Sequence, residues 1–141
     1  MPFKKDGNIT DGNSSPLNAA ATSMILMSRE VAQEKGIKPL ATIRSIGFAG
    51  VDPTIMGAGP VPAIRRLLDR RGLGVGDIDY YEINEAFAVV NLHAERELGI
   101  SRESCNLYGG GISIGHPPGA TGVRMSLTAM RHMEVTGDRT S

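Results

Sequence analysis

The sequence predicts an α/β fold in which short strands and helices alternate and pack in layers. Segments whose apolar residues recur at helical spacing alternate along the chain with shorter, strand-like segments. Glycine or proline stands at most of the junctions between them, with 18 Gly and 8 Pro among the 141 residues. The resulting order of β, α, β, α, β, α, β, α is that of a layered α/β domain, and we expect residues 1–141 to form one such domain.

The first part of the chain predicts a loop, a long helix and a strand. Residues 3–18 are polar and rich in Gly, Asn and Ser, which is typical of a strand end followed by a loop. Two serines and Pro16 then favour a helix start. Over residues 17–35 apolar side chains recur at spacings of three and four, and Gly36 is placed to end this helix. Residues 40–51 alternate as in a strand.

The rest of the chain predicts three helices separated by two short strands. In chain order these are a helix over 60–71, a strand over 78–83, a helix over 85–98, a strand over 105–108 and a helix over about 120–133. Glycines follow the ends of the first two of these helices, as is typical of a C-cap. No further strand follows the last helix, so we expect the layered domain to be incomplete at its C-terminal end.

Composition and charge exclude several classes of protein. Fifteen Lys and Arg balance fifteen Asp and Glu, whereas dedicated nucleic-acid binders usually carry a basic excess. No run approaches the ~18 apolar residues of a membrane-spanning helix, and the start does not resemble a secretory signal. Cys105 is the only cysteine, so no internal disulfide can form and a reduced, cytoplasmic setting is expected. One cysteine and three scattered histidines give little support for a metal site.

The segment from Gly109 to Gly122 is the strongest indication of a functional site. It places His116 in a turn rich in glycine and proline, directly before a predicted helix start. Glycine lets the backbone approach closely and adopt positive φ, and proline stiffens the turn, so the segment suits holding an imidazole beside a ligand. Histidine is the usual proton carrier near neutral pH. His93 and His132 lack such flanking residues and are expected to be structural or exposed.

A second candidate begins at Asn84, where the predicted strand over 78–83 passes into a helix. Side chains at the carboxyl ends of strands in α/β folds point into the functional crevice. The Asn84 amide is therefore a candidate for holding a water or a carbonyl oxygen, and it is equally placed to serve as the N-cap of the helix. Glu85 is either an acid in the first turn, favoured by the helix dipole, or a partner of His116 behind the reacting groups.

Three other segments carry weaker signals. Gly12–Ser15 precedes a predicted helix, which capping and turn formation explain. The glycines of 57–62 are not followed by Gly-Lys-Ser or Gly-Lys-Thr, so this segment is not a phosphate-binding P-loop. Cys105 precedes an apolar strand-like segment and is expected to be buried rather than nucleophilic.

Four motifs taken together resemble the thiolase family, and in particular the bacterial degradative 3-ketoacyl-CoA thiolases. In chain order they are Gly-Asn-Ser-Ser at 12–15, the segment Ile55–Ala63, the Asn-Glu-Ala-Phe box at 84–87, and Gly-His-Pro at 115–117 followed by Gly119–Gly122. The resemblance covers nearly the whole chain and matches the C-terminal half of a thiolase. It implies a layered, thiolase-like C-terminal domain with a mixed sheet packed with helices.

The resemblance implies a role for each candidate residue. His116 matches the histidine that deprotonates a nucleophilic cysteine, and Asn84 matches the asparagine whose bound water joins that histidine in binding the thioester oxygen. Ala86 and Phe87 match positions lining the acyl-CoA pocket, and Ser15 matches a serine near the pantetheine. The implied reaction is ping-pong acyl transfer between CoA thioesters, with CoA as a substrate and no separate cofactor.

The match also has gaps. The family's nucleophilic cysteine belongs to its N-terminal half and a second, acid/base cysteine follows the last helix; Cys105 corresponds to neither. We therefore expect these residues alone to lack turnover. We expect them to act in fatty-acid β-oxidation as part of a homo-oligomer or together with a complementary thiolase half. The missing cysteines, and Ala19 and Ala20 where relatives have Asp-Gly, leave open a non-catalytic partner module. A ketoacyl synthase relative fits less well, because that group uses a second histidine where Asn84 lies.

Overall fold

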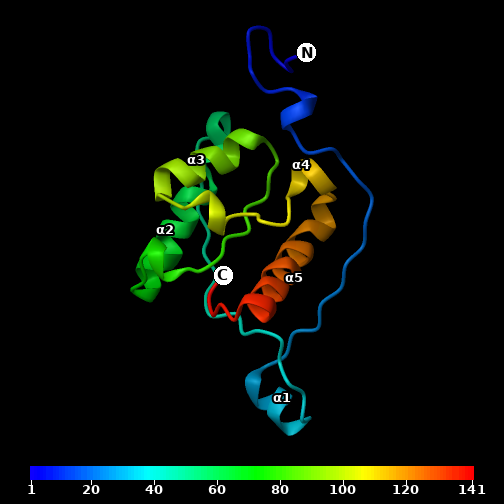
Figure 1. The fold of residues 1–141 in the computed structure, drawn as a ribbon, viewed down its shortest axis with the longest axis vertical. Coiled ribbons are helices and arrows are strands. Elements are labelled where there is room, and N and C mark those ends of the chain that lie inside the picture. Colours follow the sequence, from blue (N-terminus) through cyan, green and yellow to red (C-terminus); the bar gives the residue numbers. More distant parts are fainter.

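The computed structural model of the protein describes all 141 residues and consists of helices joined by loops (Figure 1). The helices are α1 (Arg29–Glu34), α2 (Pro60–Arg71), α3 (Ala88–Leu98), α4 (Gly111–Ile114) and α5 (Pro118–Thr136). Short 3-10 segments lie at Asp11–Asn13, Pro53–Ala58, Val75–Asp77 and Arg102–Ser104. Helices α2 and α3 lie together on one side of the molecule and α5 lies on the other (Figure 1).

The three longer helices confirm the predicted ones, and their ends follow from proline and glycine. Helix α2 coincides with the predicted range 60–71 and ends at Gly72, whose φ of 65° is the left-handed conformation of a helix C-cap. Helix α3 begins three residues later than predicted, because residues 85–87 are not helical and belong to the loop before it. Helix α5 begins at Pro118 and ends at Thr136, extending beyond the predicted 120–133 at both ends.

The long helix predicted over residues 17–35 is wrong. Only α1 at its C-terminal end is helical, and it lies away from the other helices at the end of an excursion along the outer side of α5 (Figure 1). Met24 and Met27, two of the residues that recur at the helical spacing, are 37% and 40% exposed. A short amphipathic helix is stabilised mainly by packing of its apolar face, and much of that face is exposed here.

The predicted mixed sheet is unconfirmed, because the structure contains no strand ladder. Residues 40–51 make no backbone–backbone hydrogen bond; instead Arg66 and Arg70 of α2 donate to the carbonyls of residues 48 and 46, at 3.3 and 3.2 Å. The predicted strands at 78–83 and 105–108 meet in one parallel bridge between Tyr81 and Cys105. A period of two indicates an extended segment, but a strand also needs a neighbour along its length, and these residues supply only isolated pairings.

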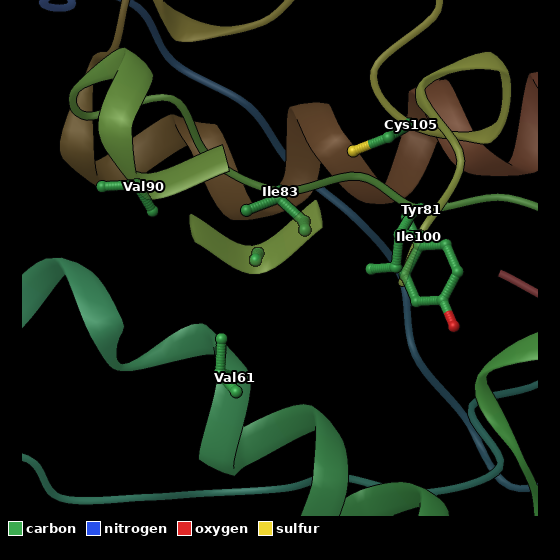
Figure 2. Close-up of a cluster of buried hydrophobic side chains, with 7 residues drawn as sticks. Val61, Tyr81, Ile83, Val90, Ile100 and Cys105 are labelled. Atoms are coloured by element: carbon green, nitrogen blue, oxygen red, sulfur yellow. The ribbon is translucent and has the colours of Figure 1, made fainter. Parts of the chain in front are cut away.

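The hydrophobic core lies between α2, α3 and the extended residues 80–84. Figure 2 shows Val61 from α2, Val90 from α3, and Tyr81 and Ile83 from the extended segment, together with Cys105. Tyr81 and Ile83 enter this core, so the residues that alternate with them, at 80, 82 and 84, face the other way. None of the helices is both long enough and apolar enough to cross a membrane.

Candidate active site

Three segments far apart in the sequence converge beside the first turn of α5. The backbone N–H of Ser15 donates to the carbonyl of Ala86 at 3.1 Å, and Ser14 pairs with Phe87 as an antiparallel bridge. The backbone N–H of His116 donates to the carbonyl of Pro16 at 3.1 Å. These bonds bring together the residues that the sequence analysis selected from separate motifs.

The glycine turn makes this convergence sterically feasible. A Cβ atom on Gly110 would lie 2.5 Å from Cδ of Glu85, which is closer than any real contact. At Gly111 the same atom would touch Oδ1 of Asn84 and Cβ of Ser15, at 3.2 and 3.3 Å. The glycines therefore let the turn approach both other segments, as their number in the sequence predicted.

His116 is held through Nδ1, and this leaves Nε2 as its reactive nitrogen. Nδ1 lies 2.8 Å from Thr121 Oγ1, and that hydroxyl lies 2.9 Å from the carbonyl oxygen of Pro117. Because the single hydroxyl proton goes to the Pro117 carbonyl, Thr121 must accept a hydrogen bond from Nδ1–H. Nε2 then carries the lone pair, and it lies 3.4 Å from Nδ2 of Asn84.

Asn84 faces His116 and does not cap the helix, so the N-cap interpretation is wrong. The N-cap residue of α3 is Phe87, and its side chain makes no capping bond. Asn84 Nδ2 is directed at His116 Nε2, whereas Asn84 Oδ1 is buried and has no hydrogen-bond partner. A buried amide oxygen with an unused lone pair is suited to accept a hydrogen bond from a water or a ligand.

Glu85 supports the glycine turn and makes no hydrogen bond to His116. Its Oε2 accepts a bond from the backbone N–H of Ile112 at 3.1 Å, and its Oε1 accepts one from Nδ2 of Asn106 at 3.3 Å. It lies three residues before α3, so it is not the first-turn acid that one interpretation assumed. Its carboxylate instead ties residues 84–87 to the turn that carries His116.

Sequence reasoning missed the part played by two residues, Asn106 and Thr121. Asn106 adopts a φ of 49°, and its side chain bonds both the N–H and the carbonyl of Ile83, at 2.8 and 2.7 Å. Thr121 holds the His116 ring as described above. Asparagine shortly before a run of glycines is typical of a residue with positive φ, which is a signal for Asn106. A hydroxyl in the first helical turn after a loop histidine can reach the histidine ring, which is a signal for Thr121.

The residues expected to bind substrate line one edge of the site. Ser15 is half-buried, with its hydroxyl 3.4 Å from the carbonyl of Ala86. Phe87 lines a small cavity of about 140 Å³ whose other walls are Asn8, Ile9, Asn13, Ala88, Val89 and Leu92. The structure thus places Ser15, Ala86 and Phe87 side by side.

Cys105 and His132 are buried, as expected of structural residues. Burial raises the pKa of the Cys105 thiol to about 12, so it is protonated at neutral pH and is a poor nucleophile. His132 is 6% exposed, with its Nδ1 3.1 Å from the Tyr108 hydroxyl and its Nε2 2.8 Å from Oδ2 of Asp138. Both side chains therefore have structural roles.

Replacing Thr121 by valine should change the ratio of the two neutral tautomers of His116. Without the hydroxyl, Nδ1–H loses its acceptor, and we expect the ratio of Nδ1–H to Nε2–H forms to change by about fivefold, corresponding to the ~1 kcal/mol of one hydrogen bond. Long-range ¹H–¹⁵N spectra of the labelled chain report this ratio. Thr128→Val is the matched control, because Thr128 also bonds a carbonyl one turn earlier in α5 but does not touch His116. An unchanged ratio in Thr121→Val would show that the hydroxyl does not hold the ring.

Comparison with solved structures shows the same fold in two acyl-CoA enzymes. The acetyl-CoA acetyltransferase of Bacillus anthracis superposes with a TM-score of 0.92 at 47% identity, covering 96% of this chain and 35% of that one. Human mitochondrial 3-ketoacyl-CoA thiolase in complex with CoA superposes with a TM-score of 0.87 at 37% identity, covering 97% and 35%.

Sequence comparison identifies the same group of proteins. The chain is 46% identical over 139 residues to an acetyl-CoA acetyltransferase of Syntrophomonas wolfei, covering 97% of this chain and 35% of the relative. It is 47% identical over 138 residues to a 3-ketoacyl-CoA thiolase of Marinobacter nauticus, covering 96% and 35%. It thus spans about a third of the length of these relatives. Residues 37–141 match the family described as "Thiolase, C-terminal domain", so the chain belongs to the thiolase family and carries its C-terminal domain.

Proposed function

We propose that these residues form the proton-transfer and oxygen-binding part of a thiolase. The reaction is the cleavage of a 3-ketoacyl-CoA by CoA into acetyl-CoA and a shortened acyl-CoA, or the reverse condensation. The observation that carries the proposal is the pairing of His116 Nε2 with the Asn84 amide at 3.4 Å, while Nδ1 is bonded to Thr121. One nitrogen of the ring is thereby held in place and the other is available for proton transfer.

The geometry supports the following order of events. His116 Nε2 removes the proton from a cysteine thiol, and the thiolate sulfur bonds to the 3-keto carbon of the substrate. The C2–C3 bond then breaks, its electron pair leaves with the acetyl-CoA carbanion, and an acid protonates that carbanion. CoA, losing its thiol proton, takes the acyl group from the cysteine sulfur. Once His116 Nε2 is protonated, its N–H donates a hydrogen bond to the thioester oxygen. The water bound by the Asn84 amide donates to the same oxygen.

Cys105 is not the cysteine in this proposal. It is 6% exposed and its thiol keeps its proton at neutral pH, since burial raises its pKa to about 12. It also belongs to the buried core cluster that contains Ile83 and Val90 (Figure 2). The reactive thiol is therefore assigned to residues other than these 141, consistent with relatives about three times as long.

The substrate class and the setting are part of the same proposal. Two of the relatives described above are called 3-ketoacyl-CoA thiolases, and one of these was solved in complex with CoA, which supports CoA thioesters as substrates and a role in fatty-acid β-oxidation. Ile43, Ile46 and Phe48 are 62%, 58% and 80% exposed, which supports assembly with the remaining part of a thiolase or with a second copy. We place this activity in the cytoplasm, as the single cysteine suggests.

A grafted thiolase tests the proposal. The matched region of the Marinobacter nauticus 3-ketoacyl-CoA thiolase is replaced by these residues, and thiolysis of acetoacetyl-CoA by CoA is measured. We expect turnover close to that of the parent enzyme. Asn84→Ala should lower its kcat by about 10²–10³-fold, the usual effect of removing one group that stabilises an oxyanion. The ungrafted 141-residue chain should show no turnover.

Two results would contradict the proposal. Asn84→Ala with an unchanged kcat would exclude the amide from oxygen binding. A folded grafted thiolase without turnover would favour the alternative that Ala19 and Ala20 suggest, a non-catalytic partner module. Asn91→Ala serves as a control for loss of a side-chain amide, because Asn91 is buried in α3 and its Nδ2 bonds the carbonyl of Ile83 rather than His116.

A further inference from the structure

Residues 80, 82 and 84 form one face of the extended segment, opposite the core face made by Tyr81 and Ile83. Tyr80, Glu82 and Asn84 each meet one side chain on, or directly before, α5. The active-site amide is therefore the last of three regularly spaced contacts between this segment and the helix.

The three contacts run in a consistent order. The Tyr80 ring stacks on His132, with centroids 4.0 Å apart and planes inclined by 22°. Glu82 Oε2 lies 3.3 Å from Arg124 Nη1. Asn84 Nδ2 lies 3.4 Å from His116 Nε2. As the residue number rises along residues 80–84, the number of the partner residue falls toward the start of α5. The three contacts therefore determine the position of α5 along this segment.

The contact between Glu82 and Arg124 is the nearer of the other two to the pair Asn84–His116, both along the extended segment and along α5. Arg124 follows Thr121 by one helical turn on the same face of α5, and Thr121 holds the His116 ring. Glu82 is two residues from Asn84 on the same face of the extended segment. The Glu82 and Arg124 side chains are only 6% and 21% exposed, and the Tyr80 hydroxyl also donates to Glu82.

We propose that Glu82, through its ion pair with Arg124, is a positioning residue that sets the separation of Asn84 and His116. The proposal rests on the proposed function, since it concerns the geometry of that site. A buried ion pair resists displacement, because moving one partner leaves the other charge uncompensated. Burial raises the pKa of Glu82, and Arg124 and the Tyr80 hydroxyl oppose this change. An imidazole and an amide already 3.4 Å apart lose their hydrogen bond if α5 moves by a fraction of an ångström.

Glu82→Gln in the grafted thiolase tests this role. Glutamine keeps the size of the side chain and its contact with Tyr80, but removes the charge that attracts Arg124. We expect kcat to fall by about ten- to a hundredfold with KM nearly unchanged, because misplacing a catalytic group by about 1 Å costs that much. In an Asn84→Ala background the fall should disappear, because the separation of the two side chains no longer matters.

Controls separate positioning from stability. Glu134→Gln removes an exposed ion pair with Arg131 and should leave kcat unchanged, because this pair joins two residues of α5 itself. Arg124→Lys keeps the positive charge and should retain most of the kcat. This variant still tests the ion pair if Glu82→Gln does not fold. An equal fall of kcat in the Asn84→Ala background, or no fall at all, would overturn the proposal.

A structural readout distinguishes this proposal from the proposed function. A nuclear Overhauser effect between the Asn84 side-chain amide and the His116 ring should be seen in the 141-residue chain and should be clearly weaker in Glu82→Gln. Should Asn84→Ala leave kcat unchanged, the proposed function fails while this measurement still decides the positioning role. A signal of unchanged intensity in Glu82→Gln would show that the ion pair does not set the separation.

Discussion

Replacing His116 by alanine in the grafted thiolase should lower kcat by about a thousandfold or more. The imidazole is assigned two tasks: removal of the thiol proton, typically worth about 10²–10⁴-fold, and donation toward the thioester oxygen, typically worth about 10²–10³-fold. Alanine keeps the backbone bond from residue 116 to the Pro16 carbonyl, so the loop is expected to stay in place. The kcat for thiolysis of acetoacetyl-CoA is the measurement.

His93 provides the matched control for this substitution. It lies on α3, partly buried, without the glycine and proline residues that surround His116. His93→Ala should therefore leave kcat within a small factor of the parent value. A His116→Ala variant that retains a tenth of the parent activity would exclude the imidazole as the base, whatever the effect of Asn84→Ala.

Replacing Gly110 by alanine should cause a large loss of stability. The new methyl group would stand 2.5 Å from Cδ and 2.6 Å from Oε2 of Glu85. Glu85 cannot move aside without giving up its bonds to Ile112 N–H and Asn106, and hydrogen bonds to a charged group are worth about 1.5–3 kcal/mol each. We expect about 2–4 kcal/mol less stability, seen as a fall of several degrees in the thermal midpoint of the grafted thiolase.

Gly122→Ala is the control for this experiment. Gly122 is exposed within α5 and a Cβ there would meet nothing within 4 Å. Alanine favours a helix over glycine by up to ~1 kcal/mol, so this variant should be as stable as the parent or slightly more stable. A Gly110→Ala variant that melts with the parent would show that the turn has room to relax.

The helices were predicted correctly wherever proline or glycine marks an end and the apolar face finds a partner. Helix α2 has Pro60 at its first position and Gly72 after its last, and Val61 and Leu68 on its inner face are buried. The segment over 17–35 has a similar spacing but an exposed face, and only α1 forms there. Spacing indicates which side of a helix is apolar, whereas the element that covers that side is a property of the whole fold.

The sequence alone was sufficient to select His116, Asn84, Ser15 and the glycine turn, because residue type and motif spacing are local properties. It also indicated the family to which the chain belongs. The tertiary structure decided that Asn84 faces His116 instead of capping α3, and that Thr121 holds the ring. These contacts join residues that lie in separate segments, and their geometry depends on how α5 packs along residues 80–84. Local sequence cannot specify such packing, since it results from the burial and charge of side chains brought together only by folding.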